Sequence, residues 1–262
     1  MKLTSPLPLH DALARMRART PMPTWLDTEG LAELEQDVLD KAMFSARNVY
    51  GDVLQEFKTG IEDLLNPRTE LRADGTPFTA GMNPAELRTR VKEMYRRIGY
   101  SPLPEEAGTI QDHASDARIN LVIYMNERDA ANYAQFKRNQ SPALLHSHPC
   151  MELVRFEDRK EKRAWLERWR GAGGKVFAGR PEGLPLAKES VQAEGRLIAR
   201  KDDPIWSAIS RFGRPWAPFD FNSGVGVRPV RRLEAIRLGV IQAGDRVQPL
   251  EVNFKQGMEE QN

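Results

Sequence analysis

The sequence predicts an α+β protein, with an N-terminal helical part followed by a small mixed α/β C-terminal domain of short strands. Apolar residues recur at three- and four-residue spacing between residues 31 and 137, which is the period of one helix face. From residue 151 onward, short strand patterns alternate with turns rich in glycine and proline. We therefore expect an extended N-terminal arm at 1–26, a helical region at 27–145, an α+β core at 146–242 and a C-terminal tail at 243–262.

The composition excludes several broad classes of protein. The chain has 262 residues, of which 40% are hydrophobic, so it is long enough to bury a core. Its 39 Lys and Arg nearly balance its 37 Asp and Glu, and a net charge of +2 does not by itself indicate a strong nucleic-acid binder or a membrane-surface protein. No apolar run approaches the roughly 18 residues of a membrane-spanning helix, and the N-terminus lacks the apolar core of a signal peptide. We expect synthesis in the cytoplasm and no membrane partner.

The N-terminal arm is predicted from its prolines and its basic residues. These are Pro6, Pro8, Pro21 and Pro23, with Arg15, Arg17 and Arg19 between them. Such an arm either lies on its own molecule or reaches a neighbouring copy, and the alternative is a poorly ordered terminus. A homo-oligomer would favour an ordered arm.

The helical region begins with a long helix or a helical hairpin. Apolar spacing supports it from about residue 28, and Pro67 ends it. The following stretch, Asn66–Met82, is expected to be a loop because it is rich in proline and glycine and contains Asp-Gly.

Two further helices are predicted. Asn83-Pro84 combines an N-cap with a proline at the first helical position, and the pattern continues to Gly99. The most regular helix is expected at Ser115–Lys137. Asn126 lies on its apolar stripe, so we expect this side chain to be hydrogen-bonded across the core.

The segment Leu145–Cys150 holds the candidate metal ligands. His146, His148 and Cys150 occupy alternate positions, so on a strand their side chains would point the same way. Imidazole and thiolate suit zinc and copper. Cys150 is the only cysteine, which excludes a disulfide framework and a cysteine-rich zinc module, and no fourth ligand is evident. We expect a loop with a buried cysteine and no cofactor, with a metal site as the alternative.

Trp165 and Trp169 lie one turn apart on a helix expected at Glu161–Arg170. The charges around them alternate in sign, which is typical of a solvated, salt-bridged face with the tryptophans turned into the core. The alternative is a basic surface on which the tryptophans stack on single-stranded nucleic acid. Glycines then lead into a strand at Lys175–Phe177.

The stretch Gly195–Val230 is expected to form a compact clasp around which the C-terminal part is organised. Strands are predicted at Arg196–Arg200 and Val225–Val230, with a short helix at Pro204–Ile209 between them. Prolines hold the next residues extended, so Trp216 and Phe219 are presented from a rigid turn.

Asp220, Asn222 and Ser223 follow within this clasp. They suit either a small polar site or a turn in which an Asp or Asn side chain caps its own backbone and Gly224 takes positive φ. We favour the turn. After it, a short helix is expected at Arg231–Leu238 and one more short strand within Val240–Val252.

Residues 108–241 as a whole resemble the phage Mu F-like head morphogenesis, or minor head, proteins. Three segments carry the resemblance, namely GTIQDHASDARINLVIYMNERDAANYAQF, ELVRFEDRKEKRAWLERWRGAGGKVF and RLIARKDDPIWSAISRFGRPWAPFDFNSGVGVRPVRRLEAIRLGVI. The resemblance implies an α+β domain appended to a helical part. It also implies a minor virion component that associates with the portal and the major capsid protein during head assembly.

Many members of that family carry cysteines and a histidine that look like a metal-stabilised knot. The matching stretches here, 159–162 and 219–224, contain no cysteine. The core is therefore expected to be held by aromatic packing, each ring burying about 150 to 250 Å². The residues concerned are Trp206, Phe212, Trp216, Phe219 and Phe221.

Three function hypotheses follow. The first is a non-enzymatic, structural protein of a virion head. The second is an enzyme of nucleotide or nucleic-acid chemistry, whose site would have to use Asp220, Asn222, Arg211 or His148. The third is a protein that binds or is ejected with packaged DNA, through the arginines of the N-terminal arm and through Arg228, Arg231 and Arg232. The first and third are compatible.

Overall fold

The computed structural model describes residues 10–157, 163–178 and 195–251. It is a mixed α+β structure, which confirms the predicted fold class. The chain divides into two compact units, which we call unit 1 (up to Ala134) and unit 2 (Gln135–Asn253). The division falls eleven residues before the expected one at 145/146, because the last turns of a long helix pack within unit 2, where the ring of Phe136 lies 5.2 Å from that of Trp216.

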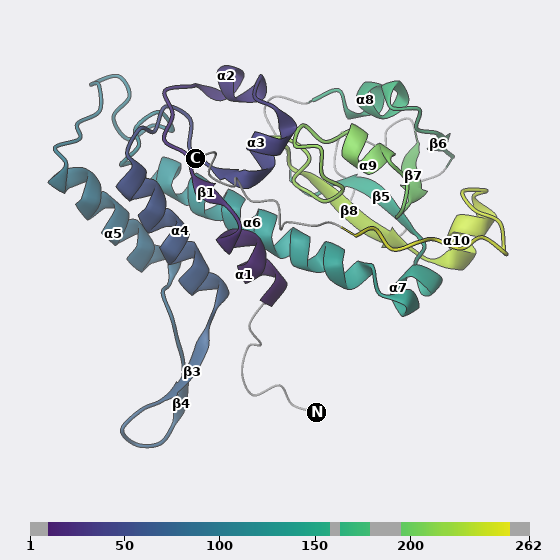
Figure 1. The fold of residues 1–262 in the computed structure, drawn as a ribbon, viewed down its shortest axis with the longest axis horizontal. Coiled ribbons are helices and arrows are strands. Elements are labelled where there is room, and N and C mark those ends of the chain that lie inside the picture. Colours follow the sequence, from purple (N-terminus) through teal and green to yellow (C-terminus); the bar gives the residue numbers. More distant parts are fainter. Residues whose placement is uncertain (1–9, 158–162, 179–194, 252–262) are drawn as a thin grey trace, which may run out of the picture. The chain divides into compact units, whose positions relative to one another are not determined.

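Unit 1 is mainly helical (Figure 1). Its elements are α1 (His10–Arg17), β1 (Thr20–Pro21), α2 (Thr28–Ala32), α3 (Gln36–Lys41), β2 (Ala42–Met43), α4 (Gly51–Leu65), β3 (Arg68–Leu71), β4 (Pro77–Ala80), α5 (Pro84–Arg97) and the greater part of α6 (Asp116–Asn139). Strands β1 and β2 form a short parallel pair. The core is built from the apolar faces of α1, α4, α5 and α6.

The expected extended arm is wrong over residues 10–17, whereas residues 18–26 contain a turn, the strand β1 and otherwise irregular backbone. Residues 10–17 form α1, whose side chains at Ala12, Leu13 and Met16 belong to the buried core. These positions lie on one face of a helix, a pattern that the flanking prolines obscured. Pro6 and Pro8 lie outside the described residues.

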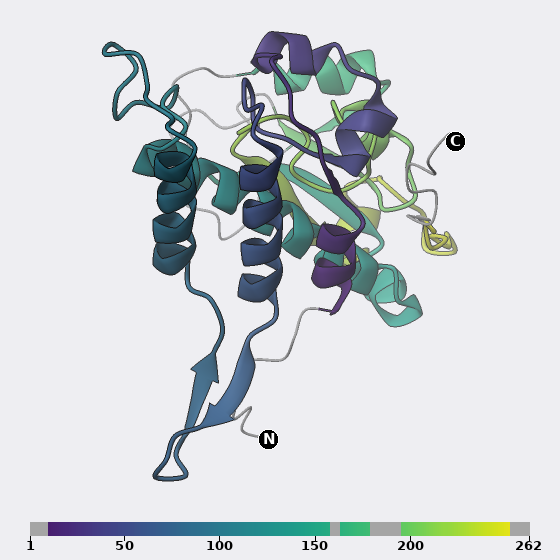
Figure 2. The same ribbon diagram turned by 60° about the vertical axis from the view of Figure 1, so that its left-hand side comes forward.

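Two other predictions in unit 1 need correction. The helix or helical hairpin expected from residue 28 is divided into three helices, α2, α3 and α4. The short helices α2 and α3 bury Leu31 and Leu39 separately. The stretch expected to be a loop contains the antiparallel hairpin β3–β4, in which Gly75 has a φ of +79°. The hairpin extends away from the ends of α4 and α5 in both ribbon views (Figure 2).

The predictions for α5 and α6 are confirmed. Asn83 caps α5 by accepting a hydrogen bond from the backbone N–H of Glu86 at 2.9 Å. Asn126 on α6 is buried and hydrogen-bonded, since its amide donates to the carbonyl of Val122 at 2.8 Å and its Oδ1 accepts from Arg19. Among the described residues no helix is long and apolar enough to cross a bilayer.

Unit 2 is built on a four-stranded antiparallel sheet in the order β6-β7-β5-β8. Its elements after α6 are α7 (Pro142–Ser147), β5 (Cys150–Arg155), α8 (Trp165–Gly171), β6 (Val176–Phe177), β7 (Arg196–Arg200), α9 (Ile205–Ala208), β8 (Val225–Val230) and α10 (Arg232–Arg237). The predicted strands and short helices of this part are therefore confirmed to within a few residues. The strand expected after α10 is wrong for the described residues, since residues 240–251 contain a bend, a turn and irregular backbone but no strand; Val252 lies outside them.

Both faces of the sheet are covered. On β5, Met151 and Leu153 join one apolar cluster whereas Cys150 joins another, and on β7 Leu197 and Ile198 divide in the same way. Because successive side chains of a strand point to opposite faces, these continuous apolar runs indicate a sheet buried on both sides. The first cluster contains the tryptophans of α8 and α9, and the second contains α10.

A close approach of α4 and α5 at Gly60 gives a first prediction. A Cβ on Gly60 would lie 2.2 Å from Cδ1 of the fully buried Leu87. Gly60→Val should therefore lower the free energy of unfolding by about 1–3 kcal/mol, the usual cost of overpacking, in urea denaturation. Gly171→Ala, where a Cβ meets nothing within 4 Å, is the control and should change stability little. Equal stability of the two variants would contradict this close approach.

Candidate functional site

Asp220, the centre of the predicted polar site, is only 1% exposed. Its Oδ1 accepts a hydrogen bond from the backbone N–H of Phe221 at 2.8 Å and from Nε of Arg211 at 3.0 Å. Its Oδ2 lies 3.1 Å from both Arg168 and Arg163. Both oxygens are therefore occupied by groups of the same chain, and the carboxylate is neutralised by guanidinium groups.

The turn interpretation accounts for the neighbours of Asp220. Asn222 is exposed and has a φ of +46°, and Gly224 follows with a φ of +67°, as expected for a turn into β8. Ser223 is buried, and its Oγ has no hydrogen-bond partner among the described residues. A buried carboxylate and an exposed amide do not share one environment, so the turn explains this stretch better than a polar site.

The predicted aromatic core is present in unit 2. Trp165, Trp169, Trp206 and Phe219 are at most 2% exposed and belong to one cluster. The ring of Trp206 lies 5.4 Å from Trp169 and 6.1 Å from Phe219. Both indole N–H groups of this stack donate to backbone carbonyls, that of Trp169 to Lys175 at 2.9 Å and that of Trp206 to Arg200 at 2.7 Å. Trp165 and Trp169 therefore serve as core residues, as favoured from the sequence.

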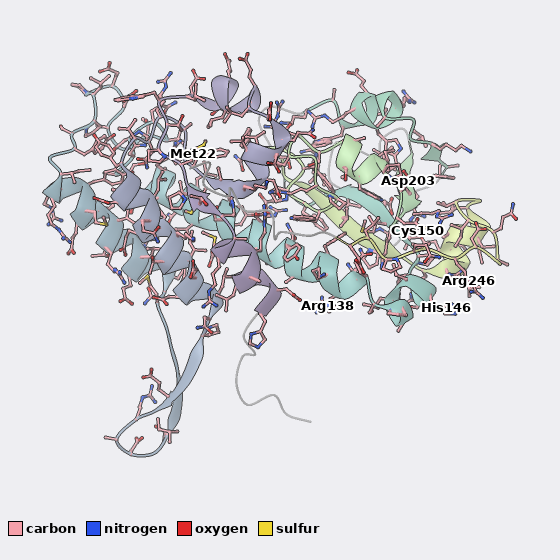
Figure 3. All side chains as sticks on the ribbon, in the orientation of Figure 1. Met22, Arg138, His146, Cys150, Asp203 and Arg246 are labelled. Carbon is pink, nitrogen blue, oxygen red and sulfur yellow. The ribbon has the colours of Figure 1, made fainter. Side chains whose placement is uncertain are left out.

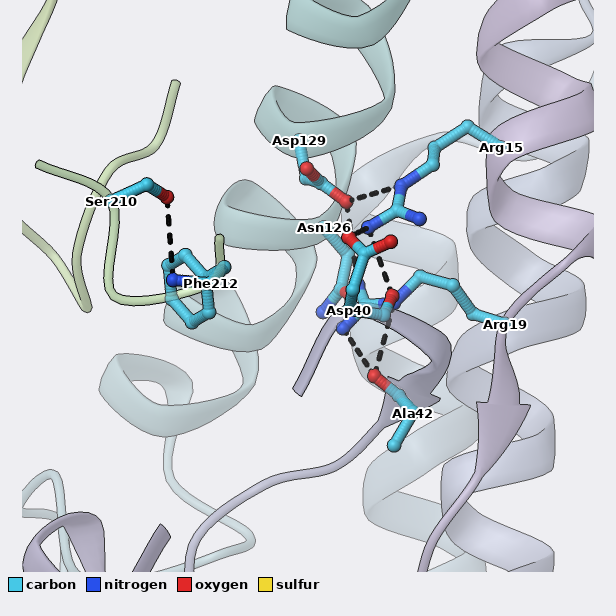
Figure 4. A network of polar contacts seen from close by, with 8 residues as sticks. All are labelled: Arg15, Arg19, Asp40, Ala42, Asn126, Asp129, Ser210 and Phe212. Atoms are coloured by element: carbon cyan, nitrogen blue, oxygen red, sulfur yellow. Dashed lines mark hydrogen bonds and ion pairs between the residues drawn. The ribbon is translucent and has the colours of Figure 1, made fainter. Parts of the chain in front are cut away.

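The remaining aromatic residues of the clasp form smaller contacts. Phe212 meets Phe221 edge to face at 5.0 Å, and the guanidinium of Arg214 lies 4.5 Å above the Phe212 ring. The backbone N–H of Phe212 also donates to Oγ of Ser210 at 3.3 Å (Figure 4). Trp216 packs on Phe136 rather than on the main cluster. The buried turn at residues 214–220 is thus held against α6 by Trp216 and against α8 by the ion pair of Asp220 with Arg168.

A buried ion-pair network centred on Glu152 was not predicted. Glu152 lies on the middle strand β5 and is fully buried. Arg196 of β7 donates two hydrogen bonds to Glu152, from Nε to Oε1 at 3.0 Å and from a terminal nitrogen to Oε2 at 2.8 Å. Arg228 of β8, which lies opposite Glu152 in the strand register, donates to Oε2 at 2.7 Å. Glu234 of α10 accepts from Arg196 at 2.7 Å and completes the network.

The network holds Arg196 and Glu234 in the charged state. Burial alone would lower the pKa of Arg196, but its hydrogen bonds to Glu152 and Glu234 outweigh burial and raise it. Burial likewise opposes ionisation of Glu234, but the hydrogen bond from Arg196 lowers the pKa of that carboxyl. A cross-strand pair of opposite charges was the available signal in the sequence, but it could be recognised only once the register was known.

The three candidate metal ligands are not brought together on a strand. His146 lies within α7 and is exposed, His148 follows the helix, and only Cys150 is on β5, where it is fully buried. The favoured loop is wrong over residues 142–147, because Pro142 starts a helix that runs to Ser147, whereas the expected burial of Cys150 is confirmed. No group of three potential ligands is found in residues 10–157, 163–178 and 195–251.

The charges around Cys150 also disfavour a cation there. Burial raises the pKa of its thiol to about 12, and the nearby cations Arg200, Arg232 and Lys201 oppose this rise. The pKa of His148 is lowered by burial and by the positive charges of Lys201 and Arg231. This is therefore a locally positive region of unit 2.

Lys201 is the most unusual ionisable group of this region. It is fully buried, and among the described residues its ammonium makes two long contacts of 3.4 Å, to the carbonyls of Asn139 and Leu144. These carbonyls belong to the last turn of α6 and to α7, where the helix dipole favours a cation. Burial lowers the pKa of Lys201 to about 8.

Most of the arginines expected to contact DNA are used inside the fold. Nε of Arg15 donates to Asp129 at 3.0 Å and its terminal nitrogen donates to Asp40 at 2.7 Å (Figure 4). Arg19 is also buried and donates to the carbonyl of Ala42 at 3.1 Å.

In unit 2, Arg228 belongs to the Glu152 network. Arg232 donates to the carbonyls of His146 and Asp245, at 2.7 and 3.1 Å. Of the three arginines expected there, Arg231 is the exposed one. The predicted DNA contact therefore loses four of its named arginines: Arg15, Arg19, Arg228 and Arg232.

Comparison of the chain with family models, with curated proteins and with solved structures gives no match.

The Glu152 network generates a prediction about stability. Glu152→Gln removes the charge that balances Arg196 and Arg228 and leaves buried cations uncompensated. Loss of one partner of a buried ion pair typically costs about 3–5 kcal/mol, so urea denaturation should show a loss of this size. Glu167→Gln, at an exposed position of α8, is the control and should stay within about 0.5 kcal/mol of wild type. Similar values for the two variants would contradict the role given to Glu152.

Lys201 generates a prediction about pH. Its pKa is about 8 when folded against an ordinary 10.5, so the folded protein holds this proton more weakly than the unfolded chain does. Below pH 8 both states are protonated and the cost of burying the ammonium is fully present. As the pH rises from 8 to 10.5 the folded state becomes neutral first and the cost disappears. The stability of wild type relative to Lys201→Met should therefore rise over this interval.

Urea unfolding at a series of pH values measures this difference. Lys175→Met, at an exposed position, is the matched control, and its stability relative to wild type should not change between pH 8 and 10.5. A difference between wild type and Lys201→Met that does not change with pH would show that Lys201 does not titrate in this range.

Proposed function

We propose that this chain is a structural protein of a tailed-bacteriophage head, a minor component that associates with the portal and the major capsid protein during assembly and stays in the virion. The proposal rests on the resemblance of residues 108–241 to Mu F-like head morphogenesis proteins. The α+β fold of unit 2 is of the kind that this resemblance implies.

One structural observation supports the proposal. Asp220, the acidic residue that the sequence offers for chemistry, is engaged with Arg163, Arg168 and Arg211, and the buried Glu152 is engaged with Arg196 and Arg228. A general acid or base needs an oxygen that can reach a substrate, whereas these oxygens are held by guanidinium groups. Their role is to fix a shape that other chains can recognise.

An enzymatic role is correspondingly less well supported. Of the residues named for it, Asp220 is buried and neutralised, and Arg211 is one of its partners. His148 lies in the positive region around Lys201, which lowers its pKa further than burial does alone. The assembly role needs no catalytic step, and it accounts for a core held by ion pairs and aromatic rings.

The proposal is tested in the phage whose genome carries this reading frame. Removal of the gene should reduce the yield of infectious particles, and a copy supplied in trans should restore it. The wild-type chain should be detected in purified heads, and after co-expression it should co-purify with the portal protein. Trp206→Ala, which empties the centre of the aromatic core, should fail to complement, whereas the exposed Glu167→Gln should complement fully.

Two results would refute this assignment. One is the formation of infectious, DNA-filled heads without the gene. The other is the absence of the chain from purified particles that were assembled in its presence.

A further inference from the structure

The two most exposed large apolar side chains of the described residues lie one on each unit. Trp25 of unit 1 is 81% exposed, and Leu233 of unit 2 is 82% exposed. A single exposed leucine is ordinary. An exposed tryptophan leaves a larger apolar area in contact with water, and tryptophan is among the residues that most often anchor protein interfaces. We therefore asked what surrounds each of them.

Trp25 is presented on a backbone that is already held in place. The N–H of Thr24 donates to the carbonyl of Asn48 at 2.8 Å, and the N–H of Arg47 donates to the carbonyl of Leu26 at 2.8 Å. The N–H of Leu26 also donates to Oγ1 of Thr24 at 3.0 Å. A side chain on such a fixed segment loses little further backbone freedom when it is bound.

The segment that follows Trp25 in the sequence is acidic, although Arg47, whose backbone N–H binds the carbonyl of Leu26, is an exposed cation next to it. Residues 25–37 contain five acidic residues and no lysine or arginine: Asp27, Glu29, Glu33, Glu35 and Asp37. Glu29, Glu33 and Glu35 are exposed, and Gly30 of α2 lies against Leu26. Asp27 and Asp37 are the members of this group that pair with cations, Arg47 and Lys41. We call Trp25, Leu26, Glu29, Glu33 and Glu35 the acidic tryptophan surface.

The surroundings of Leu233 are basic. Arg237 lies one turn after Leu233 on α10, and Arg231 precedes the helix; both are exposed. Glu234 does not offset them at the surface because it is turned toward Arg196 at 2.7 Å.

Arg246 adds to this charge. It is exposed, and its loop is tied to α10 by the hydrogen bond from Arg232 to the carbonyl of Asp245 at 3.1 Å (Figure 3). The lowered pKa of His148, to which Arg231 contributes, reports the same positive field. We call Arg231, Leu233, Arg237 and Arg246 the basic leucine surface.

We propose that copies of this chain associate head to tail, with the acidic tryptophan surface of one copy docked on the basic leucine surface of the next. Each surface has an apolar centre inside charges of one sign, and the two signs are opposite. Opposite charges across an interface favour the correct pairing and oppose pairing of like surfaces. Because each copy carries one surface of each kind, the contact is heterologous and repeats into a ring or an open chain.

We infer that each surface binds a second copy of this chain because the two surfaces carry opposite charges around an apolar centre. Two acidic surfaces, or two basic ones, would bring like charges together, which excludes a symmetric dimer through either surface alone. Nucleic acid would suit the basic arginines but offers nothing for the exposed Leu233, and it would be repelled by the acidic surface. These other occupants are distinguished by the experiment below.

The test uses the full chain and measures molar mass by sedimentation or light scattering from about 1 to 100 µM, the range of weak specific interfaces. Wild type should show a mass that grows with concentration. Trp25→Ser and Leu233→Ser should each stay monomeric. An equimolar mixture of the two should form one-to-one dimers and nothing larger, because each variant retains one intact surface. Leu71→Ser, at another exposed apolar position (70%), is the control and should associate like wild type.

Charge reversal provides a second, independent test of the proposal. Glu29→Arg with Glu33→Arg, and Arg231→Glu with Arg237→Glu, should each abolish association, and mixing the two double variants should restore it because both new pairings join opposite charges. All four positions are exposed, so the thermal unfolding of each variant should match wild type and show that the fold is kept.

Four results would overturn the proposal. They are a wild-type chain that stays monomeric throughout, association that persists in Trp25→Ser, single-site variants whose mixture yields no dimer, and double variants whose mixture stays monomeric. If wild type stays monomeric but shifts short DNA at about 50 mM salt, and Arg231→Glu with Arg237→Glu does not, the basic surface serves nucleic acid instead.

Discussion

The burial of one carboxylate in the middle strand of the sheet is the constraint on which unit 2 depends. Glu152 is taken out of water entirely, and such a charge is tolerated only when it is paired and hydrogen-bonded. The flanking strands β7 and β8 each supply an arginine, and α10 supplies the second carboxylate. A slip of one residue in either strand would turn Arg196 or Arg228 to the other face. The network therefore selects the register as well as the pairing of the strands.

Unit 1 contains a counterpart of this arrangement. Arg15 of α1 joins Asp40, at the end of α3, to Asp129 of α6 (Figure 4). Burial would lower the pKa of Arg15, but the two carboxylates outweigh burial and raise it. An ion pair of this kind requires each partner to be in place before it is favourable. It therefore adds an ion pair to the apolar packing that already holds the N-terminal helix in unit 1.

These networks change what the charged residues indicate about function. A chain that is 29% charged offers many candidates for catalysis or for binding nucleic acid. Where the structure describes them, many of the strongest candidates contact each other. Among the exposed charges, Glu29, Glu33 and Glu35 follow Trp25 on unit 1, and Arg231 and Arg237 flank Leu233 on unit 2. The proposed self-association rests on the opposite signs of these two groups.

The sequence alone determined the features that depend on near neighbours. The α+β class, the Asn83 cap of α5, the extent of α6, the strands at 150–155, 196–200 and 225–230 and the turn at Asn222 could all be predicted, because periodicity, capping and turn chemistry involve residues a few positions apart. The burial of the tryptophans of α8 followed from the same kind of local pattern.

Only the tertiary structure decided which partner each charge has. Arg15 and Asp129 are 114 positions apart, and Arg196 and Glu152 are 44 apart, so no local pattern could show that these residues neutralise one another. For the same reason the sequence left open what the arm packs on, whether Asp220 belongs to a polar site and whether the histidines near Cys150 gather around a metal. The electrostatic energy of a side chain is set by what lies within a few ångströms of it in space, and that is decided by how distant segments pack.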